Sequence, residues 1–174
     1  MSILGIDFFK SNLSGVGSRS NLFKVTVNYP SFVEGDVELT SFLCKASVMP
    51  DSTINEIAVP FRGRQLKMAG DRVFGDWNVT IINDTDFKIR DAMEKWSNGI
   101  NEHVNNTGLT NTNDYFADMV VEQLDKDGSS LKKYDFRGCW PKTIAEIALD
   151  YGTEGIEEFQ VTFAMQYWES NTTS

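Results

Sequence analysis

The sequence is poor in the side chains that most catalytic and metal sites require. Its 174 residues include one histidine, His103, and two cysteines, Cys44 and Cys139. Zinc sites draw several such ligands together, and the two cysteines lie far apart and match no metal-binding or redox spacing. His103 lies in an Asn-rich segment, where a solvated side chain is commoner than a catalytic base. We therefore predict two free thiols and no catalytic residue, metal or cofactor.

Recognisable phosphate and calcium loops are also missing. The stretch GDRVFGDW (70–77) lacks the Gly-x-x-x-x-Gly-Lys-Ser/Thr pattern and leads into a strand, whereas a phosphate loop presents its amides at the start of a helix. The segment Asp125-x-Asp127-Gly128 resembles the first part of a calcium loop, but the third acid and the later glutamate are absent. A hairpin turn accounts for this segment, so neither stretch predicts a ligand site.

Long apolar runs and an excess of positive charge are absent as well. No stretch approaches the roughly 18 apolar residues of a membrane span, and the first ten residues contain no basic region of the kind that begins a signal peptide. The formal net charge is −9, whereas binding to nucleic-acid phosphates depends on Lys and Arg. We expect no membrane span, no secretion signal, a reducing compartment and a surface that repels DNA.

The pattern that is present is alternation of apolar and polar residues, which predicts many strands. It is clearest at 76–83, where Trp77, Val79 and Ile81 share one face. Pro141 is expected to end the pairing of one strand, because proline donates no hydrogen bond to a ladder. Further strands are predicted at 21–29, 38–48, 53–60, 64–69, 115–125, 131–140 and 157–168. The last of these is about twice the usual strand length.

One helix is predicted near 86–98. Asp84, Thr85 and Asp86 are candidate N-caps, and the two acids complement the helix dipole. Asn98-Gly99 offers a left-handed stop. From 99 to 114 the chain is rich in Asn and Thr, which indicates a long surface loop. The apolar stripe of the helix consists of Ile89, Ala92, Met93, Trp96 and Ile100.

These elements predict a mainly β, or β-rich α+β, fold: an antiparallel β-sandwich or barrel with one α-helix near 86–98. The length fits a single domain over residues 1–174. Residues 1–20 would form an N-terminal arm, and residues 99–114 the long loop. The predicted elements do not alternate between strand and helix, so they give no support to a parallel sheet.

Basic residues gather around one predicted turn. Arg62, Arg64, Lys67 and Arg72 lie close together in an otherwise acidic sequence. One interpretation is a solvated hairpin whose ion pairs contribute at most about 1 kcal/mol each. The other is a patch that meets acidic residues on another copy of the chain, as a head-to-tail assembly requires. Composition alone favours the first.

Several stretches resemble the tail tube protein of contractile-tailed bacteriophages, the myoviruses. They are NLFKVTV (21–27), CKASVMP (44–50), AGDRVFGDWNVTIIND (69–84), GCWP (138–141) and FQVTFAMQYWE (159–169). Their order and spacing follow that family from about Asn21 to Glu169. The residues that carry the resemblance, and that we predict to support fold and assembly, are Gly70, Asp71, Arg72, Phe74, Asp76, Trp77, Trp140, Tyr167 and Trp168.

The resemblance implies a structural protein. Subunits of this family close into hexameric rings that stack into a hollow tube, a surrounding sheath contracts, and genomic DNA passes through the lumen without specific binding. The implied partners are further copies of the chain and the tail sheath, baseplate and tail terminator proteins. The implied location is the virion, after assembly in the cytoplasm of the host bacterium. The implied fold is the tail-tube fold, which type VI secretion tube proteins share.

Three hypotheses follow from the resemblance. Acidic residues would line the lumen and keep DNA from adhering. The segment 49–64 would project toward an adjoining ring, where Arg62 and Arg64 would meet acids. The alternating set Thr162, Ala164 and Gln166 would face the lumen or a neighbouring subunit. The alternatives are a baseplate protein that initiates the tube, a type VI secretion tube subunit, or a β-barrel that binds a small ligand.

Overall fold

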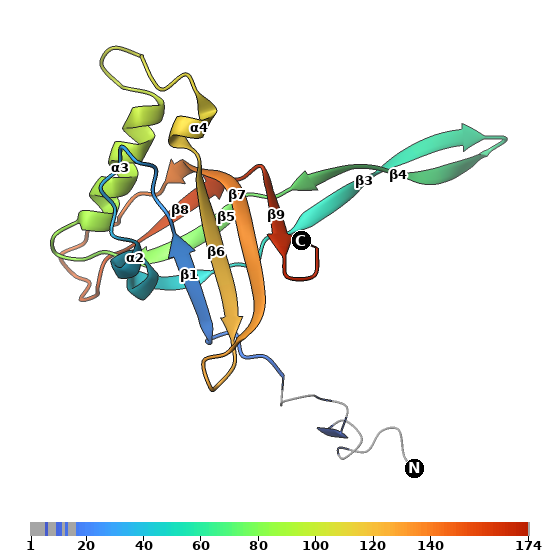
Figure 1. Cartoon of the computed structure of the whole chain (residues 1–174), viewed down its shortest axis with the longest axis horizontal. Coiled ribbons are helices and arrows are strands. Elements are labelled where there is room, and N and C mark those ends of the chain that lie inside the picture. The colour runs from blue at the N-terminus through green and yellow to red at the C-terminus, as the bar shows by residue number, and fades with distance from the viewer. Residues whose placement is uncertain (1–5, 7–9, 12, 14–16, 174) are drawn as a thin grey trace.

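The computed structural model describes residues 6, 10–11, 13 and 17–173 (Figure 1). Most of the predicted N-terminal arm lies outside these residues. The predicted antiparallel, strand-rich fold is confirmed: one sheet has the order β1-β6-β7-β8-β5-β2, with β9 also paired to β7, and β3 and β4 form a separate two-stranded sheet. The strands of the larger sheet are β1 (Phe23–Val27), β2 (Cys44–Ser47), β5 (Trp77–Ile82), β6 (Ala117–Leu124), β7 (Ser130–Ile144), β8 (Glu158–Ala164) and β9 (Tyr167–Ser170).

Strand β7 joins two halves of the larger sheet. Its first part pairs with β6 and β9, and its last part pairs with β8. Near this junction, where the β6–β7 register shifts, lies Gly138 with φ of 61°, a left-handed conformation that glycine adopts without steric cost. A Cβ there would lie 2.7 Å from Cγ of Gln166. In Figure 1 the strands β1, β6 and the first part of β7 cross in front of β5 and β8, and the core fills the space between the two layers.

The predicted core face of the central strands is confirmed. Trp77, Val79 and Ile81 on β5 are fully buried, as are Val161 and Phe163 on β8. Aromatic rings fill the centre: the ring centroids of Trp77 and Phe136 are 4.8 Å apart, and those of Trp77 and Phe163 are 5.5 Å apart. Such pairs add to the stability that burial of the rings already provides.

The predicted helix is α3 (Lys88–Ile100), and its buried residues match the predicted stripe except for Ile100, which is half-buried. Both ends differ from the prediction. The N-cap is Phe87, in a left-handed conformation and without a side-chain cap, rather than an acid at 84–86. The helix passes through Gly99 rather than stopping there. The ring of Phe32 packs where a side chain at position 99 would stand, so the position requires a glycine.

Two short helices correct the prediction of a single helix. The segment 38–48, predicted as one strand, is split into α2 (Val37–Leu43) and β2. Asp36 caps α2, because its carboxylate accepts a hydrogen bond from the Leu39 amide at 2.9 Å. The predicted surface loop at 99–114 begins inside α3 and ends in α4 (Thr112–Tyr115). In this seven-residue segment, the cap at Asp36 predicts the structure better than the apparent alternation of apolar and polar residues.

Two further corrections concern strand ends. Pro141 does not end the pairing of β7, because it lies opposite Phe163 in register and the ladder shifts only between Pro141 and Thr143. The long strand predicted at 157–168 turns a corner at 165–166 and becomes two strands. β8 lies in one layer, whereas β9 pairs with β7 in the other.

The prediction of two free thiols is confirmed for both cysteines. Cys139 is fully buried, whereas Cys44 is only partly so. Burial raises the pKa of Cys44 to about 11 and that of Cys139 to about 12. Neither thiol therefore ionises appreciably near neutral pH. Among the helices that the structure describes, none is long and apolar enough to cross a membrane.

Candidate assembly surface

A long β-hairpin projects from the body of the protein. Strands β3 (Ser52–Phe61) and β4 (Arg64–Phe74) pair along their length and join at the predicted turn, Arg62-Gly63. Figure 1 shows this hairpin extending away from the side of the body opposite α2 and α3, with no other element against it. At a rise of about 3.3 Å per residue, ten residues span roughly 33 Å. Every residue of β3 is exposed.

One face of the hairpin is apolar although none of the residues that the structure describes covers it. Residues directly opposite each other share a face, and the register pairs Ile57 with Met68 and Val59 with Leu66. Together with Phe61 these five side chains form the apolar face of the hairpin, and each is between 41% and 67% exposed. An apolar strip of this kind in a soluble protein marks an interaction surface.

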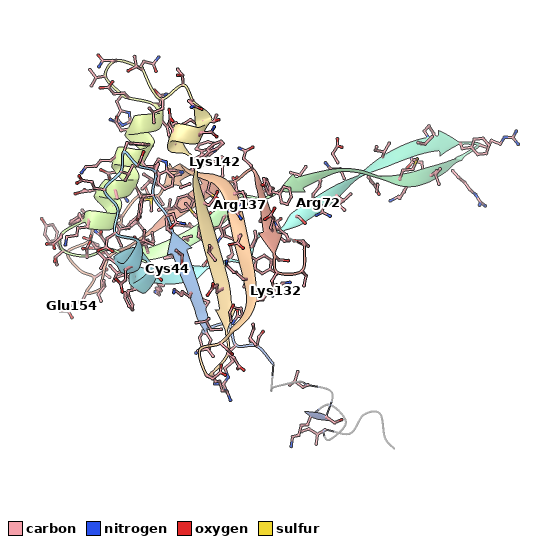
Figure 2. All side chains as sticks on the ribbon, viewed as in Figure 1. Cys44, Arg72, Lys132, Arg137, Lys142 and Glu154 are labelled. Atoms are coloured by element: carbon pink, nitrogen blue, oxygen red, sulfur yellow. The ribbon has the colours of Figure 1, made fainter. Side chains whose placement is uncertain are left out.

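The opposite face of the hairpin is polar or small. It carries Ala58, Pro60 and Gln65, and an ion pair in which Nζ of Lys67 lies 3.0 Å from a carboxylate oxygen of Glu56. The two faces together make the hairpin amphipathic. Figure 2 shows side chains standing away from both sides of the hairpin ribbon.

The tip of the hairpin is basic and aromatic. Arg62 and Gly63 have φ of 46° and 78°, which matches the two positive φ angles of a type I′ turn. A left-handed conformation costs a non-glycine residue such as Arg62 about 1 kcal/mol or more. The guanidinium of Arg62 lies 5.3 Å from the ring centroid of Phe61. Neither Arg62 nor Arg64 forms an ion pair within the described residues.

The base of the hairpin is held by aromatic side chains of the body. Nε1 of Trp168 donates a hydrogen bond to the carbonyl oxygen of Asp51 at 3.2 Å. The Trp168 ring meets Phe74 edge-on at 6.1 Å and Tyr134 at 5.3 Å. A side chain at position 75 would collide with the Asp51 carboxylate, so Gly75 permits the close approach of the two strand ends. These contacts fix the direction in which the hairpin leaves the body.

A second indole secures the connection from β2 to β3. Nε1 of the buried Trp77 donates to Oγ of Ser47 and to the carbonyl oxygen of Val48, both at 3.0 Å. Beside it, Asp76 forms an ion pair with Lys142 at 2.7 Å. Figure 2 places Lys142 in the body, away from the hairpin tip. Asp76 and Trp77 thus mark the corner where the chain returns from the hairpin to the core.

The other predicted motif residues have different surroundings. Gly70 lies within β4 rather than in a turn, and a Cβ there would come within 2.9 Å of the Asn55 carbonyl oxygen, where the register of β3 shifts. Asp71 and Arg72 are exposed and form no ion pair in the part of the chain that the structure describes. Trp140 lies in β7 opposite Ala164, and the exposed Tyr167 lies in β9 opposite Arg137.

The predicted basic patch is spread along the hairpin. Arg62 and Arg64 lie at the tip, whereas Arg72 lies near the base (Figure 2). Arg72 lies eight positions after Arg64 on β4, which corresponds to roughly 26 Å of strand. Lys67 lies between them and is paired with Glu56. The structure therefore separates the two tip arginines from the other basic residues.

The apolar face of the hairpin was not predicted from the sequence. The sequence does contain the pattern for it, because Ile57, Val59 and Phe61 alternate with other residues on one strand and Leu66 and Met68 do so on the next. That alternation predicted the two strands but did not show that the body leaves them uncovered. The sequence interpretation also missed α2 and its exposed Phe42, because a run of seven residues does not distinguish a helix from a strand by period alone.

Comparison with known sequences shows which family the chain belongs to. Residues 11–171 match the family described as phage tail tube protein. The tail tube protein gp19 of Enterobacteria phage T4 is 32% identical over 158 residues, which cover 90% of this chain and 93% of that protein. The tail tube protein of Serratia phage KSP90 is 31% identical over 150 residues, which cover 83% of this chain and 84% of that protein.

Comparison with solved structures shows the same fold at low sequence identity. A chain from the sheath-tube complex of an extracellular contractile injection system (PVC) in its extended state superposes with a TM-score of 0.63 at 15% identity, covering 93% of this chain and 96% of that one. A chain from the tube-terminating cap of the anti-feeding prophage superposes with a TM-score of 0.63 at 18% identity, covering 91% and 92%.

Proposed function

Because the chain belongs to the phage tail tube protein family, it is a structural virion protein and not an enzyme, and we propose that it is the repeating subunit of the tail tube. Six copies would close into a ring. The rings would stack into the hollow inner tube of a contractile tail, and DNA would leave through that tube into the host. Assembly would take place in the cytoplasm of the host bacterium.

The β3–β4 hairpin carries this proposal. A strip of five exposed apolar side chains on a projecting two-stranded sheet is unfavourable for a protein that remains a monomer, because open sheet edges and apolar strips promote association. A neighbouring copy in the next ring would cover the strip, so that its five apolar side chains would be buried in the contact between rings. Arg62 and Arg64 at the tip would then face acids of that copy.

The tail sheath, baseplate and tail terminator proteins are the proposed partners beyond further copies of the chain. The support is that chains of the same fold come from a sheath-tube complex, a baseplate and a tube-terminating cap. The sheath would contact the outside of the tube. The baseplate and terminator would contact its two ends.

Passage of DNA requires a wall with little affinity for phosphate. The outward face of β5 and β8 has this property, because its neutral polar residues include Asn78 and Thr162, whose side chains share a hydrogen bond of 2.7 Å. Two lysines on the neighbouring strands are neutralised: Lys45 on β2 pairs with Glu158 at 2.6 Å, and Lys142 on β7 pairs with Asp76. With the net charge of −9, this supports a lumen that does not retain DNA. A net positive lumen in an assembled tube would contradict the proposal.

The direct test is electron microscopy of the purified chain over a range of concentrations, with size-exclusion chromatography in parallel. A tube subunit is expected to form six-fold rings or hollow tubes. A chain that remains a 19.6 kDa monomer at every concentration and in the presence of its tail assembly proteins would overturn the proposal. Charge reversal at both Arg62 and Arg64 is expected to shorten the tubes. Unchanged tube length would remove these two residues from the contact between rings.

The remaining alternatives predict different results. A baseplate protein that initiates the tube would appear as a single ring and would not polymerise. A β-barrel that binds a small ligand would remain monomeric and would need an interior space. Trp77, Phe136 and Phe163 fill the centre between the sheets, so a ligand there would have to displace buried aromatic rings. This observation favours the tube subunit.

A further inference from the structure

A groove lies beside the edge strand β1, between that strand and α2. Its volume is about 650 Å³, within the range of roughly 300–1,000 Å³ that binding pockets occupy. Phe23, Val37, Phe42 and Leu124 give this α2–β1 groove an apolar lining. The Phe42 side chain is 77% exposed. An aromatic side chain presented to solvent on a short helix is available to a partner.

The surroundings of the groove are acidic. Glu38 lies in its lining, and Glu34 and Asp36 precede it at the start of α2. None of the three forms an ion pair within residues 17–173. The basic residue of the lining, Lys24, lies directly opposite Glu122 in the β1–β6 register. An occupant of the groove should therefore combine an apolar or aromatic side chain with positive charge.

The hairpin tip has this chemistry. Phe61 is 67% exposed, and Arg62 and Arg64 flank it without an acidic partner among the described residues. The tip cannot enter the groove of its own chain, because the hairpin projects from the side of the body opposite α2 (Figure 1). A second copy of the chain can provide the groove.

We propose that the tip of the β3–β4 hairpin docks into the α2–β1 groove of a second copy, with Phe61 against Phe42 and the tip arginines facing Glu38 and the neighbouring acids. This proposal rests on the proposed tube function and assigns the surface that receives the hairpin. The contact joins two different surfaces of the same chain. Such a heterologous contact repeats without closing when it runs along an axis, which is the geometry by which stacked rings lengthen.

The test is cross-linking in full-length chains that carry one cysteine at the tip and one in the groove. Phe42→Cys and Phe61→Cys are combined in a Cys44→Ala background, because Cys44 lies close to the groove and the other cysteine, Cys139, is fully buried. A short bis-maleimide is used beside mild oxidation, because a disulfide requires Cα atoms within about 7 Å. The expected result is a covalent ladder of dimers, trimers and longer species on a denaturing gel.

The controls are the two single-cysteine variants and a chain with Phe61→Cys and Val104→Cys. Val104 is 88% exposed and lies in the loop after α3, away from the groove. These chains are expected to remain monomeric on the gel. Rings or tubes in the micrographs without a ladder from the Phe42–Phe61 pair would overturn the groove assignment and leave the tube function standing. A chain that forms neither rings nor tubes would overturn both.

A charge exchange provides an independent test. Glu38→Lys is expected to raise the concentration needed for tube formation several-fold, and Arg64→Glu is expected to do the same. The chain that carries both substitutions pairs a glutamate at the tip with a lysine in the groove, so its assembly should recover toward that of the unmodified chain. Effects that simply add in the double variant would contradict the proposed pairing. The thermal unfolding midpoint should stay unchanged for Arg64→Glu, whose side chain is exposed. It should fall slightly for Glu38→Lys, because Glu38 lies in the first turn of α2, where a positive charge opposes the helix dipole.

Discussion

Strands β5 and β8 carry the same alternation of apolar and polar side chains as strands β3 and β4. Yet the apolar face of the first pair is buried, whereas that of the second pair is exposed. Trp77, Val79 and Ile81 on β5 are fully buried in the core, whereas the apolar side chains of the hairpin remain about half exposed. The chain supplies its own cover for the first pair. The hairpin strands project beyond the body, and none of the described residues covers their apolar face. In the proposed tube, another copy would bury that face.

The largest expected effect is on the body. Phe163→Ala should lower the free energy of unfolding by about 3–5 kcal/mol, because it leaves a cavity beside Trp77 and Trp96. Phe61→Ala, on the hairpin, should change it by less than about 0.5 kcal/mol. Urea denaturation, followed by tryptophan fluorescence below the assembly concentration, measures both. A loss above about 1 kcal/mol for Phe61→Ala would mean that the hairpin packs on its own body.

The next effect is on assembly. Val59→Thr combined with Leu66→Thr keeps residues that suit a strand but makes the apolar face polar. Burial of such a side chain contributes about 1.5–3 kcal/mol, and about 1.4 kcal/mol corresponds to tenfold in affinity. The concentration at which tubes form should therefore rise at least tenfold, as measured by light scattering and electron microscopy.

The matched control for this variant is Ala58→Thr with Gln65→Thr, which changes the opposite face of the same strands. This chain should assemble close to the unmodified concentration. If both pairs of substitutions impair assembly equally, the apolar face has no special role, and the comparison between covered and uncovered strands loses its functional meaning.

A smaller effect is expected at the junction of the two regions. Trp168→Phe keeps an aromatic ring beside Phe74 and Tyr134 but removes the hydrogen bond to the Asp51 carbonyl oxygen. The loss should be about 1 kcal/mol, so amide hydrogen exchange should rise about fivefold in the hairpin but not in β5 and β8. Tyr167→Phe, on the same strand, is the control and should leave exchange unchanged. Equal exchange in all three proteins would show that Trp168 does not hold the hairpin.

Much of the body could be predicted from the sequence because it follows period 2 closely. The alternation at 76–83 gave the buried face of β5, and the stripe of α3 gave its packed side. The wrong predictions share one physical cause: a local sequence pattern does not determine how a segment packs against the rest of the fold. The alternation continues through 165–166 although the chain turns there into the other layer. Likewise Asn98-Gly99 is a local stop signal, yet α3 continues through Gly99, whose missing side chain makes room for Phe32.

The candidate surface was predicted in part. The Arg62-Gly63 turn was predicted from the sequence, and the family resemblance led to the hypothesis that Arg62 and Arg64 meet another copy. The sequence did not show that the turn ends a free-standing hairpin, because a strand that awaits a partner and a half-buried strand have the same alternation. Exposure is a property of the whole fold. The groove beside α2 could not be predicted either, since the segment that contains Phe42 was predicted as a strand rather than a short helix.

The smallest expected effect separates the two interpretations that composition left open for the basic tip. Arg62→Asn keeps a residue that tolerates the left-handed conformation but removes the charge and the stacking on Phe61. The unfolding free energy should stay the same or rise slightly, whereas the assembly concentration should rise a few-fold and depend less on salt, since one charge fewer is screened. Light scattering at low and high salt measures both. If Arg62→Asn assembles with the salt dependence of the unmodified chain, Arg62 is a solvated turn residue that takes no part in docking.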